Sequence, residues 1–251
     1  MRHLYAIATT ALLAGAFVTL ALQPALKGAA APSGAGQSAQ TAAAAPRPTA
    51  PRRPGLFFKE EWKQNEKGDE HPVTQQSIAN PDLELKLYGA TAKDVQLTGK
   101  PDDENNPVHV WTGLCTTPCA VAFRHKTSMA DLSGLARIRW TTKTSGFHKV
   151  RPIVKLADGT WLVGDRNDGT ITDWIVAEFN LSEVRWLKLD INRIVTTGNY
   201  VTNPDLTKVD EIGFADLMPG SGHGPGGWSD VAQLEVYGKA VPRAATTTAE
   251  R

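Results

Sequence analysis

The chain has 251 residues, with 27 Lys and Arg against 26 Asp and Glu, so its formal net charge is only +1. A near-neutral chain with no basic block lacks the electrostatic footprint of a nucleic-acid-binding protein, and we expect no nucleic-acid partner. The sequence contains two cysteines, with no second Cys pair or His cluster nearby, and so lacks the ligand pattern of a zinc site.

The N-terminus predicts an export signal. Residues 4–22 are nearly all apolar or small, Pro24 ends the run, and Gly28-Ala29-Ala30 supplies the small residues that precede a cleavage site. We therefore predict a signal peptide at residues 1–30 and a protein that is secreted or lies in the periplasm or cell envelope. No stable membrane insertion is then expected. The alternative is an uncleaved anchor, because a run of this length just spans a bilayer, although its many Ala, Thr and Gly residues make a weak span.

Composition then divides the rest of the chain. Residues 31–55 are rich in Ala and Pro and almost lack large apolar side chains, so we predict a disordered linker there. The tail at residues 242–251 has the same character. The remaining segment, residues 56–241, is long enough for one domain with a substantial core.

Strand patterns dominate this domain. Apolar and charged residues alternate at 83–87, 136–140 and 185–191, as in strands with one buried and one solvated face. A tight hairpin is expected where Asp158-Gly159 separates the apolar runs 153–156 and 160–163, because such a turn needs positive φ angles. About nine or ten short strands with turns between them indicate an all-β sandwich.

The two cysteines predict a local disulfide. Cys115 and Cys119 flank a turn that contains Pro118, and a close pair of this kind in an exported protein favours a small structural staple. The segments 108–111 and 121–125 on either side are expected to form a hairpin that this disulfide closes.

The last third of the chain contains two strand-like segments, at 209–214 and 228–237, joined by a glycine-rich loop at 220–227. The first carries the spacing Leu206-x-x-Val209-Asp210-x-Ile212-x-Phe214, and the second ends in Tyr237-Gly238. Together with Asp131-Leu132-Ser133 before the strand at 138–141, these motifs resemble galactose-binding-like jelly-roll domains, the fold of many carbohydrate-binding modules. The resemblance implies a jelly-roll β-sandwich and a carbohydrate ligand.

Seven tryptophans fit such a ligand, because an exposed indole can stack on the apolar face of a sugar ring. Four tryptophans lie at strand ends or near loops: Trp111, Trp161, Trp174 and Trp228. Trp228, beside the glycine-rich loop, is the strongest stacking candidate, and Trp161 is also predicted to bind the ligand. Trp140 and Trp186 lie inside alternating strands and are expected in the core. Core packing is the alternative for every tryptophan.

Polar partners for sugar hydroxyls are also present. Arg139 and Arg151 suit bidentate contacts with vicinal hydroxyls or a uronate carboxylate, and Asp165 and Asp230 are available as acceptors. The competing interpretation is that the arginines belong to a solvated charged face. We expect Arg139 and Arg151 to lie on one face of a sheet, together with Lys149 and Lys155.

Residues 165–173 resemble a calcium loop, with oxygen ligands on alternate residues and a glycine at the turn. Gly169 comes one residue too early, however, and a plain Asp-Gly turn explains the segment equally. We expect no cofactor, with a structural calcium as the alternative.

Catalysis has weaker sequence support. The chain has no Gly-x-Ser-x-Gly elbow, and no spacing pairs two carboxylates as glycoside hydrolysis requires. Asp216 and His223 flank the glycine-rich loop and could form an acid/base pair, although a histidine in a loop is more often merely solvated. We therefore predict a non-catalytic carbohydrate-binding module. A secreted glycan-active hydrolase or lyase is the first alternative and would require two carboxylates in one pocket. An envelope protein-interaction or structural module is the second.

Overall fold

The computed structural model of the chain describes residues 52–65, 67–169, 171–224 and 226–243. The predicted signal peptide, most of the predicted linker and nearly all of the predicted tail lie outside the described residues. Within them the chain forms strands and three single-turn 3₁₀ helices, Gln75–Ser77, Ala92–Asp94 and Leu181–Glu183. No helix in this described part has the length and hydrophobicity needed to cross a bilayer.

The first of two antiparallel sheets, sheet A, has the strand order β12-β8-β16-β5-β4-β2, with β1 also paired to β16. Its central pair, β8 and β16, runs in register from Trp228 opposite Ser145 to Tyr237 opposite Arg137, with a bulge at Ala232. The described strands of sheet A are β1 (Leu56–Glu60), β2 (His71–Pro72), β4 (Gln96–Thr98), β5 (His109–Trp111), β8 (Arg137–Ser145), β12 (Ile175–Asn180) and β16 (Trp228–Tyr237).

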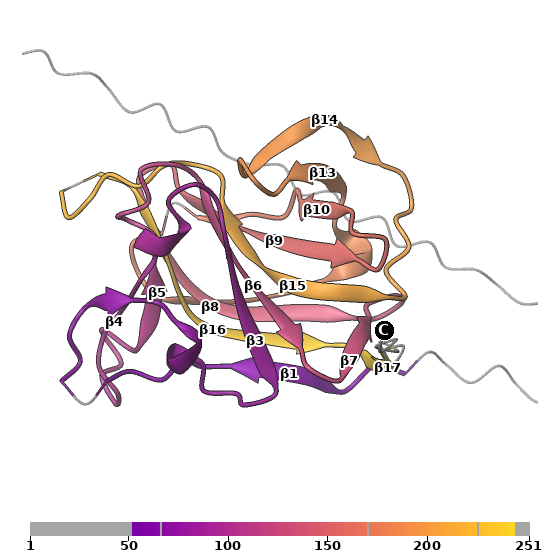
Figure 1. The fold of residues 1–251 in the computed structure, drawn as a ribbon, viewed down its shortest axis with the longest axis horizontal. Coiled ribbons are helices and arrows are strands. Elements are labelled where there is room, and N and C mark those ends of the chain that lie inside the picture. The colour runs from indigo at the N-terminus through magenta and orange to yellow at the C-terminus, as the bar shows by residue number, and fades with distance from the viewer. Residues whose placement is uncertain (1–51, 66, 170, 225, 244–251) are drawn as a thin grey trace, which may run out of the picture. The chain divides into compact units, whose positions relative to one another are not determined.

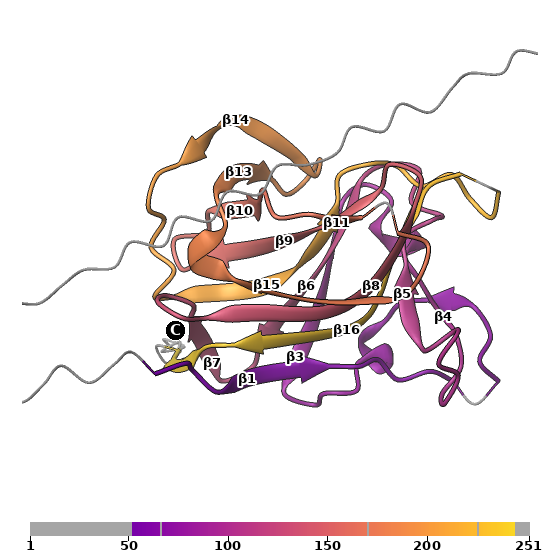
Figure 2. The same cartoon turned by 180° about the vertical axis from the view of Figure 1, so that it is seen from behind.

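The second sheet, sheet B, has the order β14-β13-β10-β9-β15-β6-β3, and β7, β11 and β17 attach to it at the side (Figures 1 and 2). Its described strands are β3 (Leu83–Tyr88), β6 (Cys119–His125), β7 (Ser128–Asp131), β9 (Lys149–Leu156), β10 (Trp161–Gly164), β11 (Asp168–Gly169), β13 (Trp186–Asp190), β14 (Val195–Val201), β15 (Val209–Asp216) and β17 (Lys239–Pro242). The expected all-β sandwich is confirmed by these two sheets.

The main core lies between the sheets, because alternate residues of each strand point inward. Trp140 on β8 and Trp186 on β13 are buried in it, as the sequence predicted, together with Phe123 and Phe214 of sheet B. Val231 and Leu234 contribute from β16. The opposite face of sheet A is called its outer face below.

Sheet B is also covered on its other face. Neighbouring residues of β9, Ile153 and Val154, point to opposite faces and are both fully buried, but they belong to different apolar clusters. The second cluster contains Trp161 of β10 and Ile194, which comes from the turn between β13 and β14. Ile194 has a φ of 52°, so this turn holds a branched side chain in an unfavourable backbone region while burying it.

The two predicted hairpins had different outcomes. The turn at Asp158-Gly159 joins β9 and β10, with Gly159 at φ 89°, so that hairpin is confirmed. The hairpin around the cysteines is wrong, because β5 belongs to sheet A while β6 pairs with β3 and β15 in sheet B. The cysteine segment is therefore a crossing between sheets.

The predicted disulfide is also corrected, since Cys115 and Cys119 are both free thiols and both buried. The Cys115 thiol lies 3.7 Å from the carbonyl oxygen of Thr91, and Cys119 opens β6 opposite Asp216. The largest effect that raises the pKa of the Cys119 thiol is its hydrogen bond with Cys115, and the second is its burial. Packing of the crossing segment, rather than a covalent link, holds the two residues.

The glycine-rich loop likewise connects the two sheets, from the end of β15 in sheet B to the start of β16 in sheet A. In Figure 1 it projects at the end of the sandwich where β4 and β5 lie, away from β17. It therefore overhangs one end of the outer face of sheet A.

Candidate functional site

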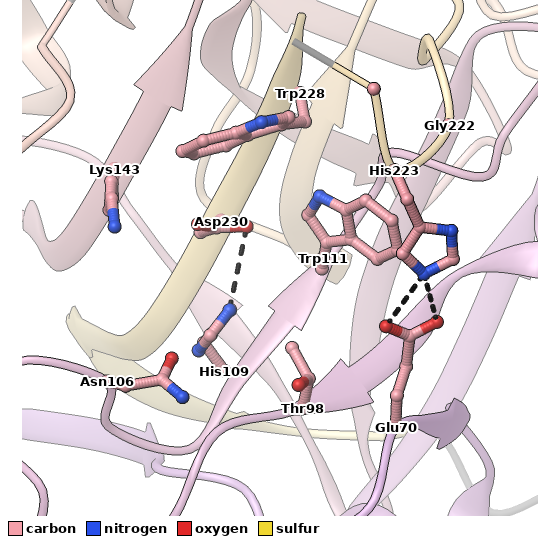
Figure 3. A pocket seen from close by; sticks show the side chains of 11 residues that line it. Glu70, Thr98, Asn106, His109, Trp111, Lys143, Gly222, His223, Trp228 and Asp230 are labelled. Carbon is pink, nitrogen blue, oxygen red and sulfur yellow. Dashed lines mark hydrogen bonds and ion pairs between the residues drawn. The ribbon is translucent and has the colours of Figure 1, made fainter. Parts of the chain in front are cut away.

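A pocket of about 250 Å³ opens beneath this loop, on the outer face of sheet A. Its wall combines two indoles with charged and polar groups from strands that are distant in sequence (Figure 3). Below it is called the Trp228 pocket. The side chains that line it are those of Glu70, Thr98, Asn106, His109, Trp111, Lys143, His223, Trp228 and Asp230, and Gly222 and Gly224 complete it.

Strand register explains how these residues meet. Asp230 on β16 lies directly opposite Lys143 on β8 and directly opposite Trp111 on β5. Directly opposite residues of antiparallel strands point to the same face, so the three side chains form one row across sheet A. Figure 3 shows Asp230 in the middle of this row, with Trp228, two residues earlier on β16, above it.

Asp230 is the most unusual polar group of the pocket. The residue is only 4% exposed, and its Oδ1 has no hydrogen-bond partner. The nearest complementary group is His109, whose Nε2 lies 3.7 Å from that oxygen, beyond hydrogen-bond distance. Burial raises the pKa of the Asp230 carboxyl well above its ordinary value, against the opposing effect of Lys143. The fold therefore disfavours the ionised carboxylate here.

His109 is held in its neutral form. Its Nδ1 lies 2.6 Å from the carbonyl oxygen of Pro107, so Nδ1–H donates there and Nε2 keeps its lone pair. Burial lowers the pKa of His109 to about 4, and the nearby charge of Lys143 acts in the same direction. The wall of the pocket thus holds an acceptor nitrogen and a carboxyl side by side, and both side chains are only 6% exposed.

Two indoles form the apolar part of the wall. Trp228 is half-buried, and Trp111 is buried and packs closely against Gly113. A Cβ on Gly113 would lie 2.0 Å from the Trp111 ring, so glycine is required for this approach. A third indole, Trp174, packs edge-on against the His109 ring beside the pocket and donates its Nε1–H to the carbonyl of Asn105.

His223 at the tip of the glycine-rich loop closes one side. Its Nε2 lies 3.1 Å from both carboxylate oxygens of Glu70, and its ring packs on Trp111 with centroids 4.9 Å apart. The loop is thereby tied to the segment before β2. Because the side chains of His223 and Glu70 are 67% and 32% exposed, this contact forms the rim of the pocket rather than its floor.

A buried polar network anchors both ends of the loop. Asp216 at the end of β15 accepts hydrogen bonds from Ser229 of β16 at 2.5 Å and from His148 at 2.6 Å. Gly227 packs on the His148 ring so closely that a Cβ there would lie 2.0 Å from the imidazole. This network fixes where β16 begins, and it therefore fixes the position of Trp228.

Asp216 and His223, the acid/base pair that the sequence suggested, do not pair. Asp216 forms a buried hydrogen bond with His148, whereas His223 forms an exposed hydrogen bond with Glu70 at the rim of the pocket.

Of the six ligand-binding residues predicted from the sequence, the structure brings together two, Trp228 and Asp230. Arg139 is also on the outer face of sheet A, but it lies four residues along β8 from Lys143 and approaches Glu235. Arg151 is on β9 of sheet B, so the shared charged face expected for the two arginines is wrong.

Trp161 and Asp165 are also placed elsewhere. Trp161 is buried in the second apolar cluster and packs edge-on against Tyr88, so it offers no free face for stacking. Asp165 accepts hydrogen bonds from the backbone and side chain of Arg185. The calcium-loop interpretation of this segment is not supported, because Asp168 is likewise held, by Trp140 and Arg166. No group of three acidic, His or Cys side chains suited to a metal occurs among the described residues.

Two carboxylates do line one pocket. Glu70 and Asp230 both contribute to the Trp228 pocket, from a loop and from β16. They differ in environment, since Asp230 is buried and unpartnered while Glu70 is at the rim and engaged by His223.

Sequence reasoning missed His109 and Lys143, and it noted Trp111 at a strand end without predicting it as a ligand-binding residue. The alternation in Val108-His109-Val110-Trp111 predicted that His109 and Trp111 share a face, and Lys143 continues the alternation of β8. The sequence contained no signal that would place those two strands on either side of β16.

Comparisons with known proteins add structural likenesses at low identity. No known protein family matches the chain, and no curated protein matches it. A family 11 carbohydrate-binding module of a cellulosomal cellulase of Clostridium thermocellum is similar at 15% identity and a TM-score of 0.38, covering 68% of this chain and 95% of the module. The family 11 module from Clostridium thermocellum in complex with a β-1,3-1,4-mixed-linked tetrasaccharide is similar at 15% identity and a TM-score of 0.37. This similarity covers 67% of this chain and 95% of the module.

An exo-β-agarase gives 9% identity and a TM-score of 0.37, covering 69% of this chain and 25% of the agarase. At these values the likenesses specify neither a family nor a ligand for this chain.

Proposed function

We propose that the protein binds a carbohydrate, without turning it over, in the Trp228 pocket. The observation that carries this proposal is Asp230, which lines a pocket walled by Trp111 and Trp228 and has a buried carboxyl oxygen without a hydrogen-bond partner. An unsatisfied buried polar atom costs roughly 1–3 kcal/mol, and a ligand that supplies its partner recovers that cost on binding.

The chemistry of the pocket matches a sugar. A ligand hydroxyl placed between Nε2 of His109 and Oδ1 of Asp230, which lie 3.7 Å apart, can donate a hydrogen bond to the nitrogen and accept one from the protonated carboxyl. The half-exposed face of Trp228 suits the C–H face of a pyranose. At about 250 Å³ the pocket is slightly below the ~300–1,000 Å³ of pockets for drug-sized ligands, so it fits one sugar unit or a chain end.

The test is binding of the full-length protein to a broad panel of soluble and insoluble polysaccharides. We expect at least one ligand whose binding weakens on Trp228→Ala. Tyr200→Ala is the matched control, because Tyr200 is an exposed aromatic on β14 of the other sheet. Absence of binding across the panel by folded protein would contradict the proposal.

Export is part of this proposal, because polysaccharides are met outside the cytoplasm. The support is the apolar run at residues 4–22 with the small residues that follow it. N-terminal sequencing of protein recovered from the medium or envelope should begin at Ala31. Recovery of an intact Met1 from the membrane fraction would instead indicate an anchor.

A second candidate is glycan hydrolysis, favoured by the two carboxylates that share the pocket. In that reaction Asp230, kept protonated by burial, would give its proton to the glycosidic oxygen, while Glu70 would take a proton from the attacking water. The reaction consumes one water for each bond broken. Release of reducing ends from a bound glycan, abolished by Glu70→Gln with binding retained, would establish this activity.

A further inference from the structure

Lys143 occupies a position that the carbohydrate proposal does not by itself require. It projects from β8 into the Trp228 pocket, directly across from Asp230 on the neighbouring strand. Its ammonium lies 5.5 Å from the centroid of the Trp228 ring and 5.6 Å from that of Trp174. The cation therefore lies within cation–π distance of two indoles, one of which, Trp228, also lines the pocket.

This cation has no anionic partner within the part of the chain that the structure describes. Across the strand, Asp230 points its unpartnered oxygen toward His109 and not toward the ammonium. The other carboxylate of the pocket, Glu70, is engaged at the opposite side by His223 (Figure 3). Because Asp230 favours its neutral form, the positive charge of Lys143 is not balanced locally.

The indoles restrict the ammonium without satisfying it. Cation–π contacts at this separation contribute roughly 0.5–1 kcal/mol, whereas hydrogen bonds to a charged group contribute about 1.5–3 kcal/mol. A carboxylate or sulfate ester on a ligand would therefore compete well for Lys143. Such a pair would also be partly shielded from solvent by Trp228 and Trp174, so salt would screen it less than a fully exposed pair.

We propose that the Trp228 pocket selects an anionic sugar, whose negative group pairs with Lys143 while its ring stacks on Trp228 and its hydroxyl reaches Asp230 and His109. This inference rests on the proposed function. It adds the charge class of the ligand, and it assigns Lys143 as the residue that determines specificity.

The experiment compares binding of the full-length protein to matched pairs of polysaccharides. One arm pairs each polyuronate with its carboxyl-reduced form, and the other pairs each sulfated glycan with its desulfated form. We expect at least tenfold tighter binding to the charged member of one arm, and that arm identifies the negative group. The preference should diminish as sodium chloride is raised.

Variants separate this inference from the proposed function. Lys143→Gln should abolish the preference for the charged member while leaving binding to its neutral partner measurable, and Lys143→Arg should retain it. Lys149→Gln is the charge-matched control, because this exposed lysine on β9 lies outside the pocket. Equal binding of both members by wild-type protein would overturn the inference and leave the proposed function standing. No binding of any glycan would overturn both.

Discussion

Lys143 and Asp230 are direct cross-strand neighbours on β8 and β16, yet in the described structure they do not form an ion pair. The Lys143 ammonium lies within cation–π distance of two indoles, and one Asp230 oxygen lies 3.7 Å from Nε2 of His109. Opposite charges placed in register normally stabilise a sheet by roughly 0.2–1 kcal/mol. Here Lys143 and Asp230 line one pocket without this stabilising contact, the pattern expected where binding takes precedence over stability.

Replacement of Trp228 by alanine should weaken glycan binding by about thirtyfold, corresponding to about 2 kcal/mol for a central aromatic contact. Titration calorimetry against the best ligand of the panel measures the change. The fold should survive, because Trp228 is half-buried at the start of β16 and not part of the core between the sheets. Loss of affinity in Tyr200→Ala of similar size would show that the effect is not specific to the pocket.

Asp230→Asn should stabilise the protein while weakening ligand binding. Burial raises the folded-state pKa of Asp230, so above the ordinary aspartate pKa the unfolded chain releases a proton that the folded chain retains. The stability of wild-type protein therefore declines as pH rises from the ordinary pKa to the folded pKa, and the asparagine variant is free of this decline. We expect a gain of about 1 kcal/mol or more at pH 8 in urea unfolding, nearly absent at pH 4. A variant less stable than wild type at both pH values would contradict this.

His109 should produce the opposite pH dependence. Its pKa is about 4 in the folded protein against an ordinary 6.5, so the unfolded chain binds the proton first as pH falls. Wild-type protein thus loses stability between pH 6.5 and pH 4, by up to about 3 kcal/mol from this group. The free energy of unfolding of His109→Gln, measured by urea unfolding, should decline less than that of wild type between pH 6.5 and pH 4. An equal decline in the two proteins would mean that His109 is not kept neutral by the fold.

The two thiols should be unreactive in the native protein. Both are buried, and the raised pKa of Cys119 reduces the thiolate that a disulfide-exchange reagent requires. Titration with such a reagent should therefore give no reaction in native protein and two thiols per chain after denaturation. No thiol in the denatured sample would indicate that Cys115 and Cys119 had formed the disulfide.

Gly227→Ala should destabilise the protein by roughly 1–3 kcal/mol, because the new Cβ would overlap the His148 ring and disturb its bond to Asp216. Gly224→Ala in the same loop is the matched control, since the nearest atom to its added Cβ, the carbonyl oxygen of Ser221, lies 3.8 Å away. Thermal unfolding should separate the two variants. Equal melting temperatures would show that the buried network does not anchor the loop.

Local sequence patterns were sufficient for much of the fold. Alternation at 83–87 and 185–191 predicted β3 and β13, and Asp158-Gly159 predicted the turn between β9 and β10. The same reasoning failed at the cysteines, because short spacing in sequence suggested a hairpin where the chain passes from sheet A to sheet B. Spacing along a strand specifies which residues share a face, but it does not specify which strand lies next to it.

The sequence by itself determined the all-β class, the core positions of Trp140 and Trp186, and the prominence of Trp228 and Asp230 beside a glycine-rich loop. These follow from period-two patterning and turn chemistry, which act over a few residues. Only the tertiary structure decided that Trp161 is buried and that Lys143 and Trp111 flank Asp230. That row depends on pairing between β5, β8 and β16, whose partners are far apart in sequence and are selected by burial of the whole sheet face.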